Sequence, residues 1–169
     1  MAGFTVSTEP TAEPLSLQEV KEYLRVEDST DERIVQHLII DARQFEENYM
    51  KRSMMQKNIT LFIDALTDQE EYLHEGMRTA PDLNYYKNYI TLPRSPVQSV
   101  TSVKTFDDND TATTFAATKY YVDTTREPAR IVLRTGETFP TALRVANAIE
   151  VIYVVGYASA FAIPEPIRI

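Results

Sequence analysis

The sequence predicts an α+β protein in which a short helix and a long helix precede a mostly antiparallel β-sheet domain. Two observations predict this fold. Before residue 53 the apolar residues recur at the spacing of an α-helix, and from Lys57 onward they recur at every second position, as in a β-strand. The chain has 169 residues, of which 43% are hydrophobic and 25% are charged, as is typical of one soluble globular domain.

The chain begins with a predicted arm and a short helix. Residues 1–14 are polar and contain two prolines, so we expect an extended N-terminal arm. Residues 15–53 form the helical part. Ser16 and Glu19 have the spacing of a capping box, in which each side chain accepts a hydrogen bond from the backbone N–H of the other residue. The first helix is therefore expected to start at this box and to end near Leu24.

The second predicted helix is longer. Ser29 and Glu32 repeat the capping-box spacing, and Lys51 and Arg52 supply positive charge at the far end. Its roughly 22 residues correspond to about 33 Å of helix. Its apolar residues form one continuous stripe at helical spacing, which predicts that the core of the helix pair contains Ile34, Leu38, Ala42, Phe45 and Tyr49.

Residues 57–159 form the predicted β-rich part. In "NITLFIDAL", Ile59, Leu61 and Ile63 share one face of a strand. The stretch "DDND" separates two segments rich in Val, Thr, Tyr and Phe and predicts a turn. The segment "AIEVIYVVGYA" is almost wholly apolar, which predicts a central strand covered on both faces.

Residues 67–88 interrupt the β-rich part with a long polar excursion. Its aromatic residues favour a contact surface with another subunit or with the next component of an assembly, and an exposed mobile loop is an equal alternative. The possible interface residues are Tyr72, Tyr85, Tyr86 and Tyr89.

Residues 160–169 form the last segment, which contains the signals of a helix start. Pro164 fixes a helical φ and lacks an N–H that a first turn would leave unpaired, and Glu165 favours the positive end of the helix dipole. The sequence stops at Ile169, before such a helix would be complete.

No motif in the chain predicts catalysis or the binding of a metal or cofactor. The chain has no cysteine and only four glycines, and its two histidines, His37 and His74, have no second histidine at a metal-binding spacing. The net charge of −8 argues against a protein that grips nucleic acid by its phosphates. We found no apolar run of about 18 residues, so we expect no membrane span, and the N-terminus lacks the order of a signal peptide, so we expect folding in the cytoplasm.

Four short segments occur in an order that is similar to a known family. These segments are "SLQEVKEYLRV", "LPRSPVQSV", "EPARIVL" and "GYASAFAIPEPIR". In this order the sequence resembles the head–tail connector (adaptor) family of long-tailed bacteriophages, prophages and gene transfer agents. The resemblance extends from about Pro14 to Arg168, and none of its segments is a catalytic motif.

The resemblance implies a structural protein of the virion neck. Similar proteins form rings, commonly of twelve subunits, that bind the portal protein, extend the DNA channel and dock the next neck or tail-completion protein. DNA is expected to pass through without sequence-specific binding, and we hypothesise that Asp and Glu residues line the channel. The family has a C-terminal apolar helix packed on the first two helices, whereas this sequence ends early; the residues expected to face the portal are Pro164, Glu165, Pro166, Ile167, Arg168 and Ile169.

Two alternatives remain. A monomeric or dimeric binding or regulatory module would have a surface without large apolar patches, whereas a ring subunit without the last helix would leave Ile34, Leu38 and Phe45 partly uncovered. A small hydrolase that uses only carboxylates has no motif to support it.

Overall fold

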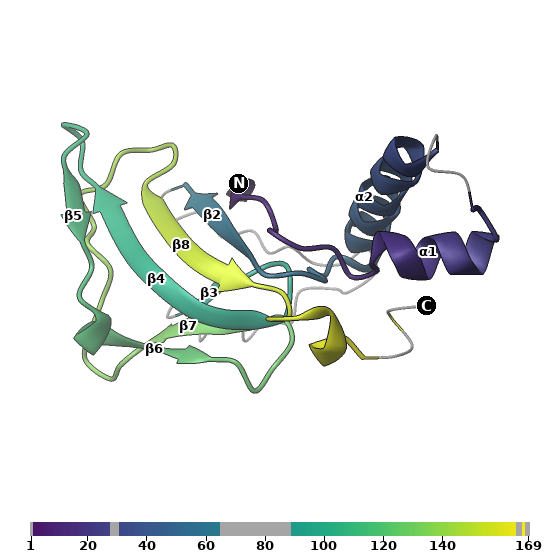
Figure 1. Cartoon of the computed structure of the whole chain (residues 1–169). Coiled ribbons are helices and arrows are strands. Elements are labelled where there is room, and N and C mark those ends of the chain that lie inside the picture. Colours follow the sequence, from purple (N-terminus) through teal and green to yellow (C-terminus); the bar gives the residue numbers. More distant parts are fainter. Residues whose placement is uncertain (1, 28–30, 65–88, 165–166, 168–169) are drawn as a thin grey trace, which may run out of the picture.

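The structure is a computed structural model that describes residues 2–27, 31–64, 89–164 and 167. Two helices lie together at one end of the molecule, and two antiparallel sheets form the other end (Figure 1). The predicted α+β class, with a helix pair followed by a mostly antiparallel β-sheet part, is confirmed.

The helices are α1 (Leu17–Leu24) and α2 (Glu32–Met50). The capping box of α1 is confirmed, because Glu19 N–H donates to Ser16 Oγ at 3.2 Å and Ser16 N–H donates to Glu19 Oε2 at 2.8 Å. The capping box predicted for α2 is wrong. Asp31 is the N-cap and Glu32 is the first helical residue instead of the third, while Ser29 lies outside the described residues. At its other end α2 stops where Lys51 adopts a left-handed conformation with φ of 56°.

The larger sheet has five strands in the order β1-β2-β8-β4-β5, and each strand is antiparallel to its neighbour. Their bounds are β1 (Ala2–Thr8), β2 (Lys57–Ile63), β8 (Ile149–Val155), β4 (Val97–Phe106) and β5 (Ala112–Thr114). The expected arm of residues 1–14 therefore differs from the structure, because its first half pairs with β2 as an edge strand. Its backbone is extended, but its hydrogen bonds are those of a sheet.

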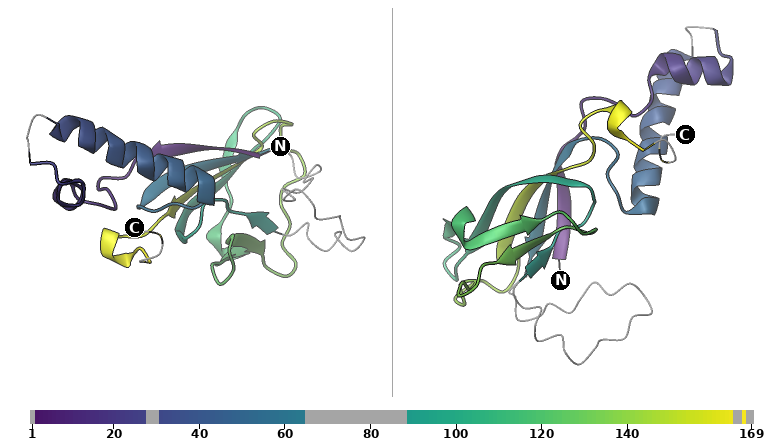
Figure 2. Two further views of the ribbon diagram at one scale, coloured as in Figure 1. Left: turned by 90° about the vertical axis from the view of Figure 1, so that its right-hand side faces the viewer. Right: turned by 90° about the horizontal axis from the view of Figure 1, so that it is seen from below.

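The smaller sheet has three strands in the order β3-β7-β6. These are β3 (Tyr89–Thr91), β7 (Arg130–Leu133) and β6 (Tyr120–Asp123). Within the described residues, two single 3₁₀ turns accompany the strands, η3 (Ala117–Lys119) before β6 and η4 (Ala160–Ala162) after β8. Two further views show α2 extending away from the sheets, with η4 near the helices (Figure 2).

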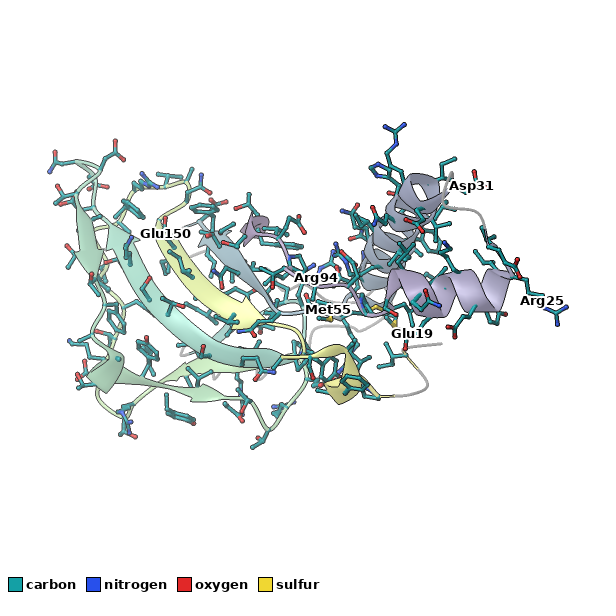
Figure 3. All side chains as sticks on the ribbon, in the orientation of Figure 1. Glu19, Arg25, Asp31, Met55, Arg94 and Glu150 are labelled. Carbon is teal, nitrogen blue, oxygen red and sulfur yellow. The ribbon has the colours of Figure 1, made fainter. Side chains whose placement is uncertain are left out.

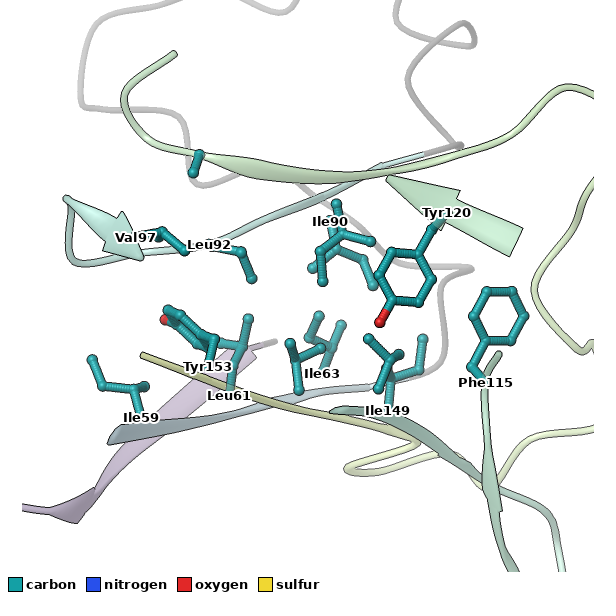
Figure 4. Close-up of a cluster of buried hydrophobic side chains, with 14 of the residues drawn as sticks. Ile59, Leu61, Ile63, Ile90, Leu92, Val97, Phe115, Tyr120, Ile149 and Tyr153 are labelled. Carbon is teal, nitrogen blue, oxygen red and sulfur yellow. The ribbon is translucent and has the colours of Figure 1, made fainter. Parts of the chain in front are cut away.

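The main core lies between the two sheets, whose inner side chains meet face to face (Figure 4). Ile59, Leu61 and Ile63 contribute from β2, which confirms their predicted common face. The predicted central position of β8 is also confirmed, since it pairs with β2 on one side and β4 on the other. Only one of its faces is fully buried, because its residues alternate between buried and half-buried. Tyr153 is enclosed there and donates its hydroxyl to Pro93 O at 2.9 Å, and burial raises its pKa.

Two carboxylates hold turns between strands. The predicted turn at "DDND" is confirmed: Asp107 Oδ1 accepts from the backbone N–H groups of Thr111 and Asn109, at 2.8 and 2.9 Å, and these bonds lower the pKa of Asp107. After β6, the Thr125 hydroxyl and then the Arg130 guanidinium lower the pKa of Asp123 by hydrogen bonding to its carboxylate. Within the described ranges, no helix is long and apolar enough to cross a bilayer.

Candidate assembly surfaces

A buried ionic network joins α2 to the rest of the chain. Arg43 and Glu47 lie on the side of α2 that faces the rest of the molecule, and their side chains are only 4% and 3% exposed. Arg43 donates Nε to Glu13 Oε2 at 2.7 Å and Nη1 to Glu47 Oε2 at 3.2 Å. Because Glu13 lies in the segment between β1 and α1, the guanidinium ties that segment to the helix.

Glu47 also connects α2 to the start of β2. Its carboxylate accepts from Lys57 Nζ at 2.5 Å and from the backbone N–H of Met54 at 2.7 Å. On the other side Arg94 donates to the backbone carbonyl of Glu47 and to Asn48 Oδ1. Burial strengthens these hydrogen bonds, and removing one partner would destabilise the fold by leaving a buried charge unpaired. The network therefore fixes the position of α2 relative to the start of β2.

A small apolar cluster supports the same junction. It consists of Met54, Met55 and Ile163, with Met50, Tyr157 and Ile167 packed against it. Gly156 lies so close to the backbone of Met55 that a Cβ atom on it would be 2.1 Å from Met55 O. Its φ of +90° is in the left-handed region. Only glycine fits this crossing, which brings the end of β8 against the segment that follows α2.

The apolar stripe predicted for the helix-pair core lies on the outside of the molecule. Ile34 is 57% exposed, Leu38 55%, Phe45 72% and Tyr49 82%, and Ala42 is exposed between them. The prediction that these residues form a core within the chain is wrong, because α2 turns the opposite side, with Val35, Arg43 and Glu47, toward the molecule. The expectation that Ile34, Leu38 and Phe45 are uncovered is confirmed. We call Ile34, Leu38, Ala42, Phe45 and Tyr49 the α2 ridge.

A groove lies on the inner side of the helix pair, lined by residues of α1, α2 and η4. The side chains of these elements lie at the same end of the molecule (Figure 3). The groove is open to solvent, has a volume of about 800 Å³ and is mainly apolar. We call it the helix groove; its walls are the linker of residues 12–16, Leu17 and Glu19 of α1, Gln36, Ile39 and Ile40 of α2, and Ala160 and Phe161 of η4.

The other predicted site residues are only partly described. Of the expected portal-facing tail, Pro164 is exposed and Ile167 is half-buried, with Ile167 N–H donating to Pro164 O at 2.9 Å. Glu165, Pro166, Arg168 and Ile169 lie outside the described residues, and so do Tyr72, Tyr85 and Tyr86. Tyr89 is half-buried in β3, where the Arg130 guanidinium lies 5.4 Å from its ring centre.

The fold is similar to that of chains in solved structures of gene transfer agent (GTA) particles. A chain in the neck of an empty GTA particle, computed with C6 symmetry, matches with a TM-score of 0.70 and 19% identity over 96% of this chain and 75% of that one. A chain in the virion of a native GTA particle matches with a TM-score of 0.68 and 18% identity over 95% and 75%. A chain in the neck of a native GTA particle, computed with C12 symmetry, matches with a TM-score of 0.62 and 20% identity over 97% and 74%.

These matches establish the fold. The chain has a two-helix, two-sheet architecture that also occurs in the neck of phage-like particles, so the resemblance to the connector family is confirmed at the level of the fold. No family model matches the sequence, and no curated protein matches it significantly.

Proposed function

We propose that this chain is a structural subunit of the head–tail connector in the neck of a phage-like particle, with no catalytic activity. The observation that carries the proposal is the similarity of nearly the whole chain to neck and virion chains of gene transfer agent particles. Two of those neck structures were computed with C6 and C12 symmetry, which supports a ring of copies, with twelve as the expected number.

In this role the ring extends the DNA channel below the portal protein and offers a docking surface to the next neck or tail-completion protein. The tail of residues 164–169 is proposed to contact the portal, and the tyrosines of the 67–88 excursion together with Tyr89 are proposed to contact a neighbour. The net charge of −8 favours a channel through which DNA passes without binding to the wall. A structure of the assembled ring with a basic channel wall would reject this last point.

The α2 ridge is the observation that bears on the alternative of a monomeric or dimeric binding or regulatory module. Four large apolar side chains of one helix are more than half exposed there, and an apolar patch on a soluble protein is often a contact surface. A ring subunit has a use for such a surface, since each copy contacts two neighbours.

The proposal is tested by native mass spectrometry of the purified chain, alone and mixed with the portal protein of the same genome. We expect a ring-sized complex, formed either alone or on the portal. A chain that is folded by circular dichroism but stays monomeric in both mixtures contradicts the connector function.

A further inference from the structure

The α2 ridge exposes more than half of the area that one side of a stable interface requires. Taking about 200 Å² for a large apolar side chain, Ile34, Leu38, Phe45 and Tyr49 expose about 500 Å² along one line of the helix. The largest apolar patch on a typical monomer is about 300–600 Å², and a stable interface buries about 800 Å² on each partner. The ridge with its polar margins therefore approaches the area that one side of a stable contact requires.

The helix groove offers a complementary shape on the same subunit. It is concave and mainly apolar, whereas the ridge is convex. Its α2 wall is formed by Gln36, Ile39 and Ile40. Successive residues of a helix are about 100° apart, so these three are centred about 150° around α2 from the ridge. A single helix thus presents a ridge on one side and a groove wall on nearly the opposite side.

This placement favours a head-to-tail contact between copies. A patch that contacts a copy of itself gives a closed dimer, whereas two different complementary patches on opposite flanks continue from copy to copy and close when the rotation allows. The buried contacts of Glu47 with Lys57 of β2 and of Arg43 with Glu13 tie α2 to the rest of the subunit, so both flanks keep the same orientation in every copy.

We propose that the α2 ridge of each subunit packs into the helix groove of the next copy of this chain, and that this contact closes the ring. The proposal rests on the proposed connector function and identifies the surfaces that neighbouring subunits use.

The test uses thiol cross-linking, because the chain has no cysteine of its own. Ala42→Cys places a thiol in the middle of the ridge, and Ala12→Cys or Ala160→Cys places one in the groove. The single variants are mixed in equal amounts, assembled under the conditions in which native mass spectrometry detects rings, and treated with a short bismaleimide. We expect ridge-to-groove dimers in the mixtures, none from Ala42→Cys alone, and a ladder up to ring size from a chain that carries both cysteines.

Each other outcome overturns the proposal. Homodimers from Ala42→Cys alone would mean that ridge meets ridge, and rings without cross-links from either groove position would place the contact elsewhere. If no variant and no unmodified chain assembles, alone or with the portal, the connector function fails as well. Rings that form without ridge cross-links would overturn only the interface.

A second measurement separates folding from assembly. Phe45→Ser removes a ridge side chain that is 72% exposed, so we expect an unchanged melting temperature but at least a tenfold rise in the concentration at which half of the chain is assembled. The matched control is Gln44→Ser, the neighbouring exposed position on the same helix and off the ridge, which should assemble as the unmodified chain does. If Phe45→Ser forms normal rings but loses portal binding, the ridge belongs to the portal contact and the proposal is wrong.

Discussion

Replacing Glu47 by glutamine tests the buried network that holds α2 against the sheets. The substitution keeps the shape of the side chain and an oxygen that can accept from the backbone N–H of Met54, but it removes the negative charge. Arg43 retains Glu13 as an ionic partner at 2.7 Å. Lys57 does not, because among the carboxylates of the described residues only Glu47 lies within ion-pair distance of it.

The expected cost follows from that difference. Removing one partner of a buried ion pair destabilises a protein by about 3–5 kcal/mol, because the remaining charge stays buried. The side chain of Lys57 is 7% exposed. We therefore expect Glu47→Gln to lower the free energy of unfolding by about 3 kcal/mol, the lower end because Arg43 stays paired. For a chain of this length that corresponds to a fall of about 6–12 °C in melting temperature.

Thermal and urea unfolding of Glu47→Gln, followed by circular dichroism, measure this change. The control is Glu46→Gln, the same chemical change at the preceding, half-buried position of α2, for which we expect less than about 0.5 kcal/mol. If the two variants lose the same stability, the network does not anchor the helix and the reasoning is refuted. Lys57→Met added to Glu47→Gln should restore most of the loss, because the buried ammonium that lost its partner is then replaced by an apolar group while the introduced amide oxygen still accepts from Met54 N–H.

Three further changes test other parts of the fold. Gly156→Ala should lower the free energy of unfolding in urea by at least about 3 kcal/mol. The new Cβ would lie 2.1 Å from Met55 O, and the left-handed backbone adds about 1–2 kcal/mol of strain. A smaller loss would mean that the end of β8 and the segment at Met55 separate easily. Tyr153→Phe should lose about 1–2 kcal/mol, since the carbonyl of Pro93 loses its buried donor, and a neutral result would show that the hydroxyl is dispensable. The pKa of Asp123 is lowered in the folded chain. Its ionised carboxylate therefore stabilises the fold above its ordinary pKa of 3.8, and this stabilisation is lost as the pH falls through the lowered pKa. Between pH 5 and pH 3 the urea midpoint of Asp123→Asn should therefore fall less than that of the unmodified chain.

The sequence predicted the sheet domain better than the packing of its helices. The alternation in β2 and the apolar run of β8 identified both strands, because the period of two is a local property. The β1 strand was missed as part of the sheet, since nearby prolines suggested a free arm and its partner β2 begins about fifty residues later. Strand pairing over that distance leaves little local signal.

The buried face of α2 was assigned to the wrong side for a physical reason. The helix carries apolar residues around much of its circumference, and the longest regular stripe, from Ile34 to Tyr49, is the exposed one. The true inner face includes Arg43 and Glu47, and charged residues count as surface in any hydrophobic pattern. Their spacing of four residues was the available signal, but it indicates an ion pair on the helix and not its burial. Burial depends on Glu13 and Lys57, which only the fold brings close.

The place of β8 in the sheet governs when the chain can fold during synthesis. β8 follows the other described strands in the sequence, yet it lies between β2 and β4, so neither of those strands has its inner partner until the ribosome has passed Val155. At about 5–20 residues per second, the interval between the end of β4 and the start of β8 lasts about 2–9 s. During that time the apolar faces of β2 and β4 are open to chaperones and to one another. Chains cut short before Ile149 therefore lack the strand that joins the two halves of the sheet.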